Sequence, residues 1–570
     1  MNFIKGMDIS FLTELLDCGV CFRDKEGNRR EIFELLKENG VNSIRLRLWN
    51  EPENVIESKG YCNLDHTIAM AKRIKENHMS FFLDFHYSDF WADPGKQEKP
   101  KAWKELDKEG LIQAVYEYTK QVLNTLKKEG VLPDLVQIGN EIRSGMLFPD
   151  GEVPDYHGLV QLINAGIRAV REFAGVQVVI HLDQGGRYHY LRDWFDAAIS
   201  QGLDAFDIIG LSYYPFWHGT FADLKESMVK LVKRYQKPII IAETAHAWRK
   251  TEDGFIGEQQ EKIAGFPATP EGQRKVLDLV MSITASLEDD MGLGIYYWEP
   301  VVVPEDGVPG WSSNMGIFDE EAKALPALES FRFTKTKEEI INPVKIYMPE
   351  PIVVTVGEVT PLPKSIRVLY SDGSVTNLPV WWEEYDTKQA GEILVRGWVN
   401  EISKKVRITL SVMEKLAKDY NFIPNGNFEN GLTGWQIQKS DVRVLTELRP
   451  DFIEPFPAPP KHYVYLESPM NFQFCMHHTI EGIKNGEYVL KVEYMGSNTT
   501  GVDVKIYAKT DENRAKEAII YPTDENWVTY ELSNIIIEKG KIEVGIKLTS
   551  PPVFGKVRRF ALIKMPNSHA

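Results

Sequence analysis

Short apolar runs alternate with longer segments of helical periodicity over the first 335 residues. Stretches such as 30–40, 64–78 and 111–130 repeat apolar residues every three or four positions, and several end in Gly, a common helix stop. The apolar runs predict eight strands at 6–12, 43–49, 80–88, 135–141, 176–183, 206–215, 237–244 and 293–300. Eight strand–helix units predict an α/β fold, a (β/α)8 TIM barrel over residues 1–335. A doubly wound sheet is the alternative, but no G-x-G-x-x-G follows the first strand.

The pattern changes to strict alternation after residue 344. Residues 344–412 alternate around Asp372-Gly373, a hairpin signal, and predict a small β-sandwich with Trp381, Trp382 and Trp398 in its core. Residues 421–570 contain further alternating runs such as "GEYVLKVEYMG" and "NWVTYELSN". Their number and spacing predict a jelly roll, in which Trp435 is expected to be a core residue. The predicted architecture is therefore a barrel followed by two all-β domains.

Charge and cysteine content narrow the possible partners. A net charge of -16 argues against nucleic acid and anionic membranes, which both need clustered Lys and Arg. No apolar run approaches the ~18 residues of a membrane span. Four cysteines in 570 residues are not a disulfide scaffold, and the C-x-x-C pair Cys18 and Cys21 lacks a second pair at zinc spacing. A neutral polymer fits this composition.

Polar and aromatic residues gather where the predicted barrel strands end. In a (β/α)8 barrel the carboxyl ends of the strands carry the active site. Trp and Tyr at such positions can stack on the faces of sugar rings. The candidate site residues are Arg45, Asp84, His86, Asp89, Trp91, Asn140, Glu141, Tyr213, Tyr214, Trp217, His218, Glu243 and Trp298.

Two carboxylic acids in this set match glycoside hydrolysis. Glu141 and Glu243 end strands four and seven, from which inward side chains can approach ~5 Å, the spacing of retaining enzymes. Asn140 is placed to bind the sugar 2-hydroxyl. Arg45 is expected to lie under Glu243 and hold it ionised while Glu141 stays protonated. A single Glu is more often a surface or capping residue, so the hypothesis depends on the pair.

Several motifs in the first 335 residues resemble the arabinogalactan endo-β-1,4-galactanases of glycoside hydrolase family 53. The most specific are "DFHYSDFWADPGKQ", "VQIGNE", "YYPFWHGT", "AETA" and "YYWEP". The resemblance implies that Glu141 is the acid/base and Glu243 the nucleophile, with Arg45, His86, Asn140 and Tyr213 or Tyr214 in the site. It also implies β-1,4-galactan, the type I arabinogalactan side chain of pectin, as the substrate.

The loops after strands seven and eight depart from the family pattern. Bacterial members often bind calcium there, but "AHAWRKTEDGFIGEQQEK" offers only Glu252 and Asp253, without Asp-x-Asp spacing. We therefore expect no calcium, and no cofactor or other metal. The first ten residues lack the apolar core of a signal peptide. A polysaccharide substrate still favours secretion, with a cytoplasmic location as the alternative.

The β-rich regions resemble accessory modules of such enzymes. Residues 344–412 are similar to bacterial Ig-like domains, through "SIRVLYSDGS" and "VWWEE", whose usual role is spacing. Residues 421–570 begin with "NFIPNGNFENGLTGWQIQ" and resemble jelly-roll carbohydrate-binding modules of family 61. The segment 462–478 supplies the candidate stacking rings Tyr463, Tyr465, Phe472 and Phe474.

Two rival functions are compatible with the same residues. One is an endoglycanase of the same clan with another polymer specificity. The other is a galactan-binding protein without catalysis, which the presence of Glu141, Glu243 and Asn140 disfavours.

Overall fold

A computed structural model shows two compact units, Met1–Asn342 with Tyr370–Ser374 and Pro343–Leu369 with Val375–Ala570. No helix among its described residues is both long and apolar enough to cross a membrane. The structure describes residues 3–250, 261, 264–303, 314–335, 341–349, 351–414, 420–428, 432, 434–439, 445–451, 461–468, 472–497, 503–511, 514–521, 523, 527–550 and 553–565.

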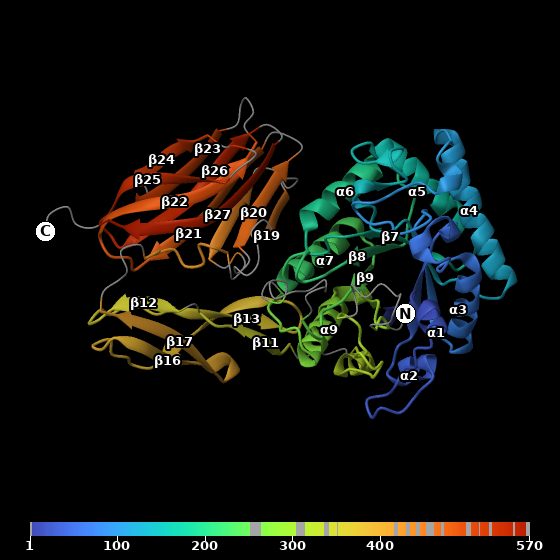
Figure 1. Ribbon diagram of the computed structural model, residues 1–570, viewed down its shortest axis with the longest axis horizontal. Coiled ribbons are helices and arrows are strands. Elements are labelled where there is room, and N and C mark those ends of the chain that lie inside the picture. The colour runs from blue at the N-terminus through green and yellow to red at the C-terminus, as the bar shows by residue number, and fades with distance from the viewer. Residues whose placement is uncertain are drawn as a thin grey trace. The chain divides into compact units, whose positions relative to one another are not determined.

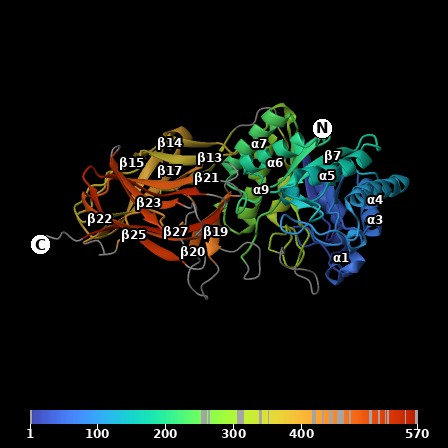
Figure 2. The ribbon, with the colours of Figure 1, turned by 90° about the horizontal axis from the view of Figure 1, so that it is seen from above.

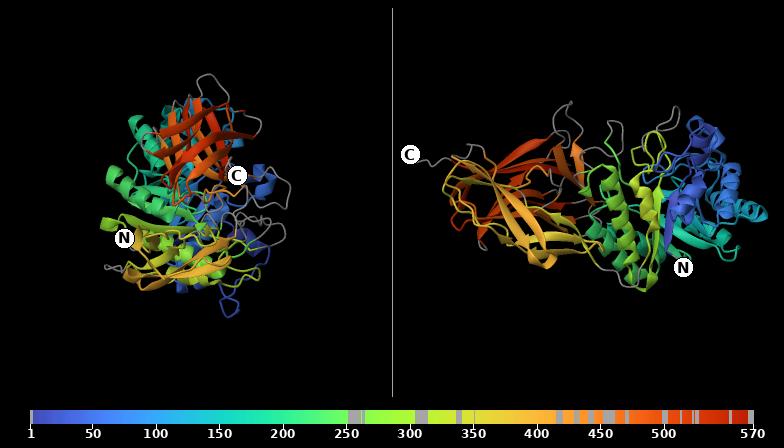
Figure 3. Two further views of the ribbon diagram at one scale, coloured as in Figure 1. Left: turned by 90° about the vertical axis from the view of Figure 1, so that its left-hand side faces the viewer. Right: turned by 90° about the horizontal axis from the view of Figure 1, so that it is seen from below.

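Eight parallel strands close the barrel in the order β1-β10-β9-β8-β7-β4-β3-β2. Helices lie outside these strands, as Figures 1 and 3 show. The fold therefore confirms the (β/α)8 prediction. The strands are β1 (Ile4–Asp8), β2 (Ser43–Leu48), β3 (Ser80–Phe85), β4 (Leu135–Ile138), β7 (Gln177–Leu182), β8 (Ile208–Ser212), β9 (Ile239–Thr244) and β10 (Gly292–Trp298). A small hairpin, β5 (Gly145–Met146) and β6 (Gly151–Glu152), follows β4.

The barrel helices begin at residues suited to capping. Asp107 accepts a hydrogen bond from Gly110 N at the start of α4, and Thr220 and Asp223 form a reciprocal capping box on α7. Such caps satisfy backbone N–H groups that have no partner inside the helix. The helices are α1 (Leu12–Asp17), α2 (Ile32–Glu38), α3 (Leu64–Glu76), α4 (Lys108–Lys128), α5 (Tyr156–Val170), α6 (Tyr188–Ser200), α7 (Phe221–Tyr235) and α9 (Pro270–Ala285).

Several barrel strands end earlier than their apolar runs suggested. The run 135–141 leaves the strand at Ile138, because Gly139 turns with φ +76 and a Cβ there would lie 2.6 Å from Ile142 Cγ2. Glu141 follows in the left-handed region with φ 47, as do Tyr87 after β3 and Glu299 after β10. Non-glycine residues in this region cost on the order of 1 kcal/mol each and cluster at functional sites. The strained positions lie at the end of the barrel predicted to carry the site.

The region predicted as an Ig-like domain contains two small sheets, ordered β11-β13-β14 and β12-β17-β16-β15. Figure 2 labels strands of both. The hairpin expected at Asp372-Gly373 joins β13 to β14, with Leu369 paired to Val375. The strands are β11 (Pro343–Tyr347), β12 (Ile352–Thr355), β13 (Ser365–Tyr370), β14 (Val375–Pro379), β15 (Trp381–Trp382), β16 (Gly391–Val399) and β17 (Lys404–Met413).

The tryptophan prediction for this domain was wrong at two of three positions. Trp382 packs against the core of Val395, Ile408 and Leu410. Trp381 and Trp398 face each other across β15 and β16 and are 68% and 37% exposed. Neighbouring residues of a strand point to opposite faces, so Trp381 and Trp382 cannot both be core.

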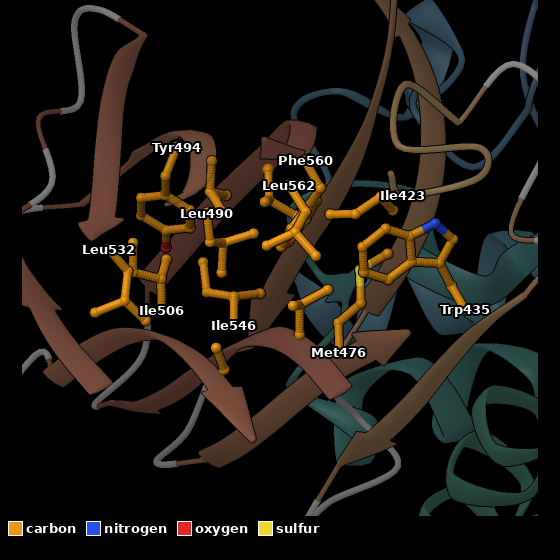
Figure 4. Packing of buried hydrophobic residues seen from close by; sticks show 14 of the residues in the cluster. Ile423, Trp435, Met476, Leu490, Tyr494, Ile506, Leu532, Ile546, Phe560 and Leu562 are labelled. Atoms are coloured by element: carbon orange, nitrogen blue, oxygen red, sulfur yellow. The ribbon is translucent and has the colours of Figure 1, made fainter. Parts of the chain in front are cut away.

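The C-terminal region folds into two five-stranded sheets, ordered β18-β21-β26-β23-β24 and β19-β20-β27-β22-β25. Their facing side chains form one apolar core, in which Trp435 is 7% exposed and lies 4.5 Å from Phe560 between ring centroids (Figure 4). Trp435 is therefore a core residue, as predicted. The strands are β18 (Trp435–Lys439), β19 (Leu445–Asp451), β20 (Lys461–Ser468), β21 (Phe472–Glu481), β22 (Gly486–Gly496), β23 (Asp503–Asp511), β24 (Arg514–Ile520), β25 (Val528–Ile537), β26 (Lys541–Ser550) and β27 (Val553–Lys564).

Candidate active site

A cleft of about 630 Å³ opens at the carboxyl ends of the barrel strands. Its walls come from β1, β2, β3, β9 and β10 and from the segments that follow β3, β4, β7 and β8. Eleven of the thirteen residues predicted for the site line it: Arg45, Asp84, His86, Trp91, Asn140, Glu141, Tyr214, Trp217, His218, Glu243 and Trp298.

Arg45 organises the floor of the cleft. Its guanidinium is 1% exposed and donates from Nη1 to Asp8 Oδ2 and Glu243 Oε1, each at 2.9 Å, and from Nη2 to Asp84 Oδ2 at 2.8 Å. Burial disfavours the charged guanidinium, but Asp84, Glu243 and Asp8 together raise the pKa of Arg45. The contact expected between Arg45 and Glu243 is thus present.

Glu243 is held on both carboxylate oxygens. Arg45 bonds to Oε1, and the Tyr214 hydroxyl donates to Oε2 at 3.2 Å. Burial raises the pKa of Glu243 to about 7, and the positive charge of Arg45 opposes that rise. Two donors aimed at the ionised form leave the carboxylate fixed in position and pointing into the cleft.

Glu141 lacks such a cation. Its Oε1 lies 2.6 Å from Ser212 Oγ, and no Arg or Lys among the described residues pairs with it. Burial, with the nearby charge of Glu243, raises the pKa of Glu141 well above its ordinary value. Of the two carboxyls, Glu243 therefore ionises first and Glu141 keeps its proton, the division of roles that an acid and a nucleophile require.

Asn140 is locked by its neighbours. Its Nδ2 donates to Ala92 O at 2.9 Å, and its Oδ1 accepts from Arg45 Nη2 and Gln137 Nε2, each at 3.0 Å. The second hydrogen on Nδ2 has no partner in the part of the chain that the structure describes. Asn140 can therefore present an N–H donor to a ligand hydroxyl from a rigid position.

Aromatic rings form part of the wall of the cleft. Trp298 lies 6.4 Å from Trp91 and 6.3 Å from Tyr214 between ring centroids, both in edge-on arrangements. Trp217 is 39% exposed and contacts Tyr214 edge-on at 5.4 Å. The exposed ring surface of Trp217 suits the C–H face of a pyranose.

Two predicted site residues do not reach the cleft. Asp89 accepts hydrogen bonds from Glu51 N at 3.1 Å and Lys101 N at 2.9 Å and holds the surrounding loops. Tyr213 is fully buried and donates from its hydroxyl to Gly219 O at 3.1 Å. The prediction placed both in the site because they adjoin strand ends, but neighbours such as Tyr213 and Tyr214 point in opposite directions.

The set drawn from strand ends omitted some residues that line the cleft and some that bond to its lining. Asp8, the last residue of β1, pairs with Arg45, and its place at a strand end was a usable signal. Ser212 and Gln137 sit inside apolar runs, where sequence offers no sign that their side chains face the carboxyls. Asp93 and Lys96 come from the long loop after β3.

The predicted absence of calcium concerns residues outside the described part of the chain. The residues outside the described part include Glu252, Asp253 and much of the loop after β10. Among the described residues, no group of three or more His, Cys, Asp or Glu side chains is arranged to hold a metal ion.

Known proteins resemble the barrel closely. A family model described as "Glycosyl hydrolase family 53" matches residues 4–331, and one described as "Bacterial Ig-like domain (group 4)" matches residues 350–402. An "Endo-beta-1,4-galactanase" of Bacillus subtilis is 34% identical over 381 residues, covering 59% of this chain and 86% of that protein. An "Arabinogalactan endo-beta-1,4-galactanase" of Cellvibrio japonicus is 34% identical over 351 residues, covering 58% of this chain and 90% of that protein.

A solved structure agrees with these matches. The "Ignisphaera aggregans GH53 catalytic domain" is 36% identical, covers 58% of this chain and 96% of that one, and has a TM-score of 0.55.

Proposed function

Because the chain belongs to glycosyl hydrolase family 53, we propose that its barrel is an endo-β-1,4-galactanase that cleaves galactan with retention at the anomeric carbon. The observation that carries this proposal is the pair of carboxyls in the cleft, of which Glu243 is buried and Glu141 half-buried. Glu243 is held by Arg45 and Tyr214, whereas Glu141 is kept protonated by burial. The galactanases of Bacillus subtilis and Cellvibrio japonicus support galactan as the substrate.

The reaction proceeds in two displacements. Glu243 attacks the anomeric carbon and forms a glycosyl ester, while Glu141 gives its proton to the departing glycosidic oxygen. Glu141, now ionised, takes a proton from water, which attacks the same carbon and releases Glu243. Asn140 donates to the sugar 2-hydroxyl, and this bond strengthens as positive charge develops at the anomeric carbon.

Product analysis tests this function. Galactan incubated with the protein should release reducing ends, and proton NMR should show the β anomer first. An initial α anomer would contradict the retaining mechanism. Release from another β-glycan but not from galactan would favour the rival specificity within the clan, and no release from any polymer would favour a binding protein.

A second proposed function belongs to the C-terminal jelly roll, because one sheet carries rings and paired charges on its outer face. Tyr463 and Trp527 lie 5.8 Å apart between centroids, and the Arg558 guanidinium lies 4.1 Å from the Trp527 ring. Arg558, 7% exposed, donates to Glu493 at 2.7 Å. Rings beside hydrogen-bonding charges are what a neutral sugar chain needs: a surface for its C–H face and partners for its hydroxyls.

Of the four ring candidates from the sequence, two lie in the core of the jelly roll and two do not. Phe472 and Phe474 are 3% and 2% exposed and belong to the core, so the prediction of an outward role was wrong for both. Tyr463 and Tyr465 are half-buried, and Tyr465 stacks on Phe554 with centroids 6.5 Å apart. We propose that the outer face with Tyr463, Tyr465 and Trp527 binds galactan.

An extracellular location remains part of the proposal. A long galactan chain meets the enzyme only where the polymer is present, outside the cell. Fractionation of the producing cells tests this, since activity confined to the cytoplasm would contradict it.

A further inference from the structure

A chain of buried polar side chains lies behind the acid/base Glu141. Ser212 Oγ is 2.6 Å from Glu141 Oε1 and 2.9 Å from His181 Nε2. On the other side of the imidazole, His181 Nδ1 is 3.0 Å from Asn140 Oδ1. Ser212 and His181 are fully buried, so their hydrogens must be shared among these contacts.

Asn140 fixes the far end of the chain. Its orientation is set because Nδ2 donates to Ala92 O while Oδ1 accepts from Arg45 and Gln137. Oδ1 therefore faces His181 as an acceptor, and their 3.0 Å contact is a hydrogen bond only if Nδ1 carries the proton.

The position of the proton on His181 determines which way the Ser212 hydroxyl points. Burial and the nearby charge of Arg45 hold the pKa of His181 well below its ordinary value, so the ring is neutral and has one N–H. With that proton on Nδ1, Nε2 accepts from the Ser212 hydroxyl. The 2.6 Å contact between Ser212 Oγ and Glu141 Oε1 then needs a second hydrogen, which Glu141 must supply.

The opposite polarity is less favourable. A proton on His181 Nε2 would let Nδ1 accept from Glu141 N, but that contact is long, at 3.4 Å. It would also set two acceptors, Nδ1 and Asn140 Oδ1, 3.0 Å apart in a buried site. The first arrangement gives up the 3.4 Å contact and sets the Glu141 N–H against Nδ1–H, but the second gives up the shorter 3.0 Å hydrogen bond and sets two acceptors against each other, so the first is preferred.

We propose that Asn140, His181 and Ser212 form a hydrogen-bond chain of one polarity that keeps the proton on Glu141 in the resting enzyme. The proposal rests on the acid/base role proposed for Glu141 and makes Ser212 and His181 positioning residues. To act as the acid, the Glu141 hydroxyl turns from Ser212 Oγ to the glycosidic oxygen and gives up its one proton there. The carboxylate left behind faces a Ser212 oxygen whose hydrogen points to His181 Nε2. The carboxylate then recovers a proton from the attacking water.

Nitrogen NMR tests the polarity without any activity. In the full chain labelled with ¹⁵N-histidine, the His181 signals, assigned through His181→Gln, should show a neutral ring protonated on Nδ1. A ring protonated on Nε2, or a charged ring near neutral pH, would overturn the proposal. This result stands even if the protein fails to hydrolyse galactan, an outcome that would count against the function alone.

The pH profile of Ser212→Ala provides a second test, whose sign separates the two polarities. If Ser212 accepts from protonated Glu141, its loss disfavours the protonated form, and the basic limb of kcat/KM on galactan moves about 0.5–1 pH unit lower. If Ser212 donates to the carboxylate, its loss moves that limb higher, which would contradict the proposal.

The other groups facing Glu141 are unchanged in this variant: Glu243 on β9, Asp183 after β7, Asp93 after β3 and Tyr214 after β8. Ser43→Ala is the matched control, because Ser43 is a buried barrel hydroxyl bonded to Tyr296 rather than to a carboxyl. Its profile should coincide with that of the unaltered protein.

Discussion

Glu141 and Glu243 differ in surroundings, and the difference predicts different losses on substitution. Glu243→Gly removes the nucleophile and should lower kcat on every substrate by on the order of 10⁴-fold. Added azide should restore turnover by attacking from the side that Glu243 vacated, which converts a β-linked substrate into an α-glycosyl azide. Glu141→Gln should lose most activity on galactan but much less on an aryl galactoside whose leaving group needs no proton. Equal losses on both substrates in Glu141→Gln would contradict its role as the acid.

Burial of Glu141 also predicts a stability cost that depends on pH. Its pKa is raised on folding, so between the unfolded and folded values the folded protein binds more protons. The free energy of unfolding therefore falls as the pH rises through that interval. Glu141→Gln cannot ionise, and its Tm should exceed that of the unaltered protein at about pH 8 and approach it near about pH 4. The exposed Glu226→Gln is the control, and a variant with lower Tm at both pH values would contradict the argument.

At the scale of elements, sequence patterns located strands and helices but not where their side chains point. Eight apolar runs predicted the barrel, because buried parallel strands are apolar throughout. A run that is apolar throughout does not show which of its side chains point toward the site. Nothing in "IIGLSYYP" distinguishes Ser212, which contacts Glu141, or Tyr214, which contacts Glu243, from the buried Tyr213. In the Ig-like strands, Trp381 was misplaced because it adjoins Trp382 and so points to the other face, and Trp398 was misplaced because it pairs with Trp381.

The loops after β9 and β10 carry a prediction about metal. Since "TEDGF" offers few oxygen ligands, we expect EDTA to leave the Tm unchanged. A calcium ion bound to the folded state would stabilise it by mass action, so its removal would lower the Tm by several degrees and added calcium would restore it. Differential scanning with EDTA, and with EDTA followed by excess calcium, distinguishes these outcomes.

At the scale of the whole molecule, a binding face tethered to a catalytic barrel predicts an effect that depends on substrate length. Holding a polymer raises its effective concentration at the cleft, whereas a short oligomer cannot engage both sites. Trp527→Ala and Tyr463→Ala in the full chain should therefore lower kcat/KM on long galactan several-fold and leave it unchanged on galactotetraose. Tyr521→Ala is the control, since Tyr521 is 77% exposed and not part of the ring cluster. Affinity electrophoresis in galactan gels should show weaker retardation for the first two variants only. Equal slowing on both substrates, or unaltered retardation, would mean that this face does not bind the polymer.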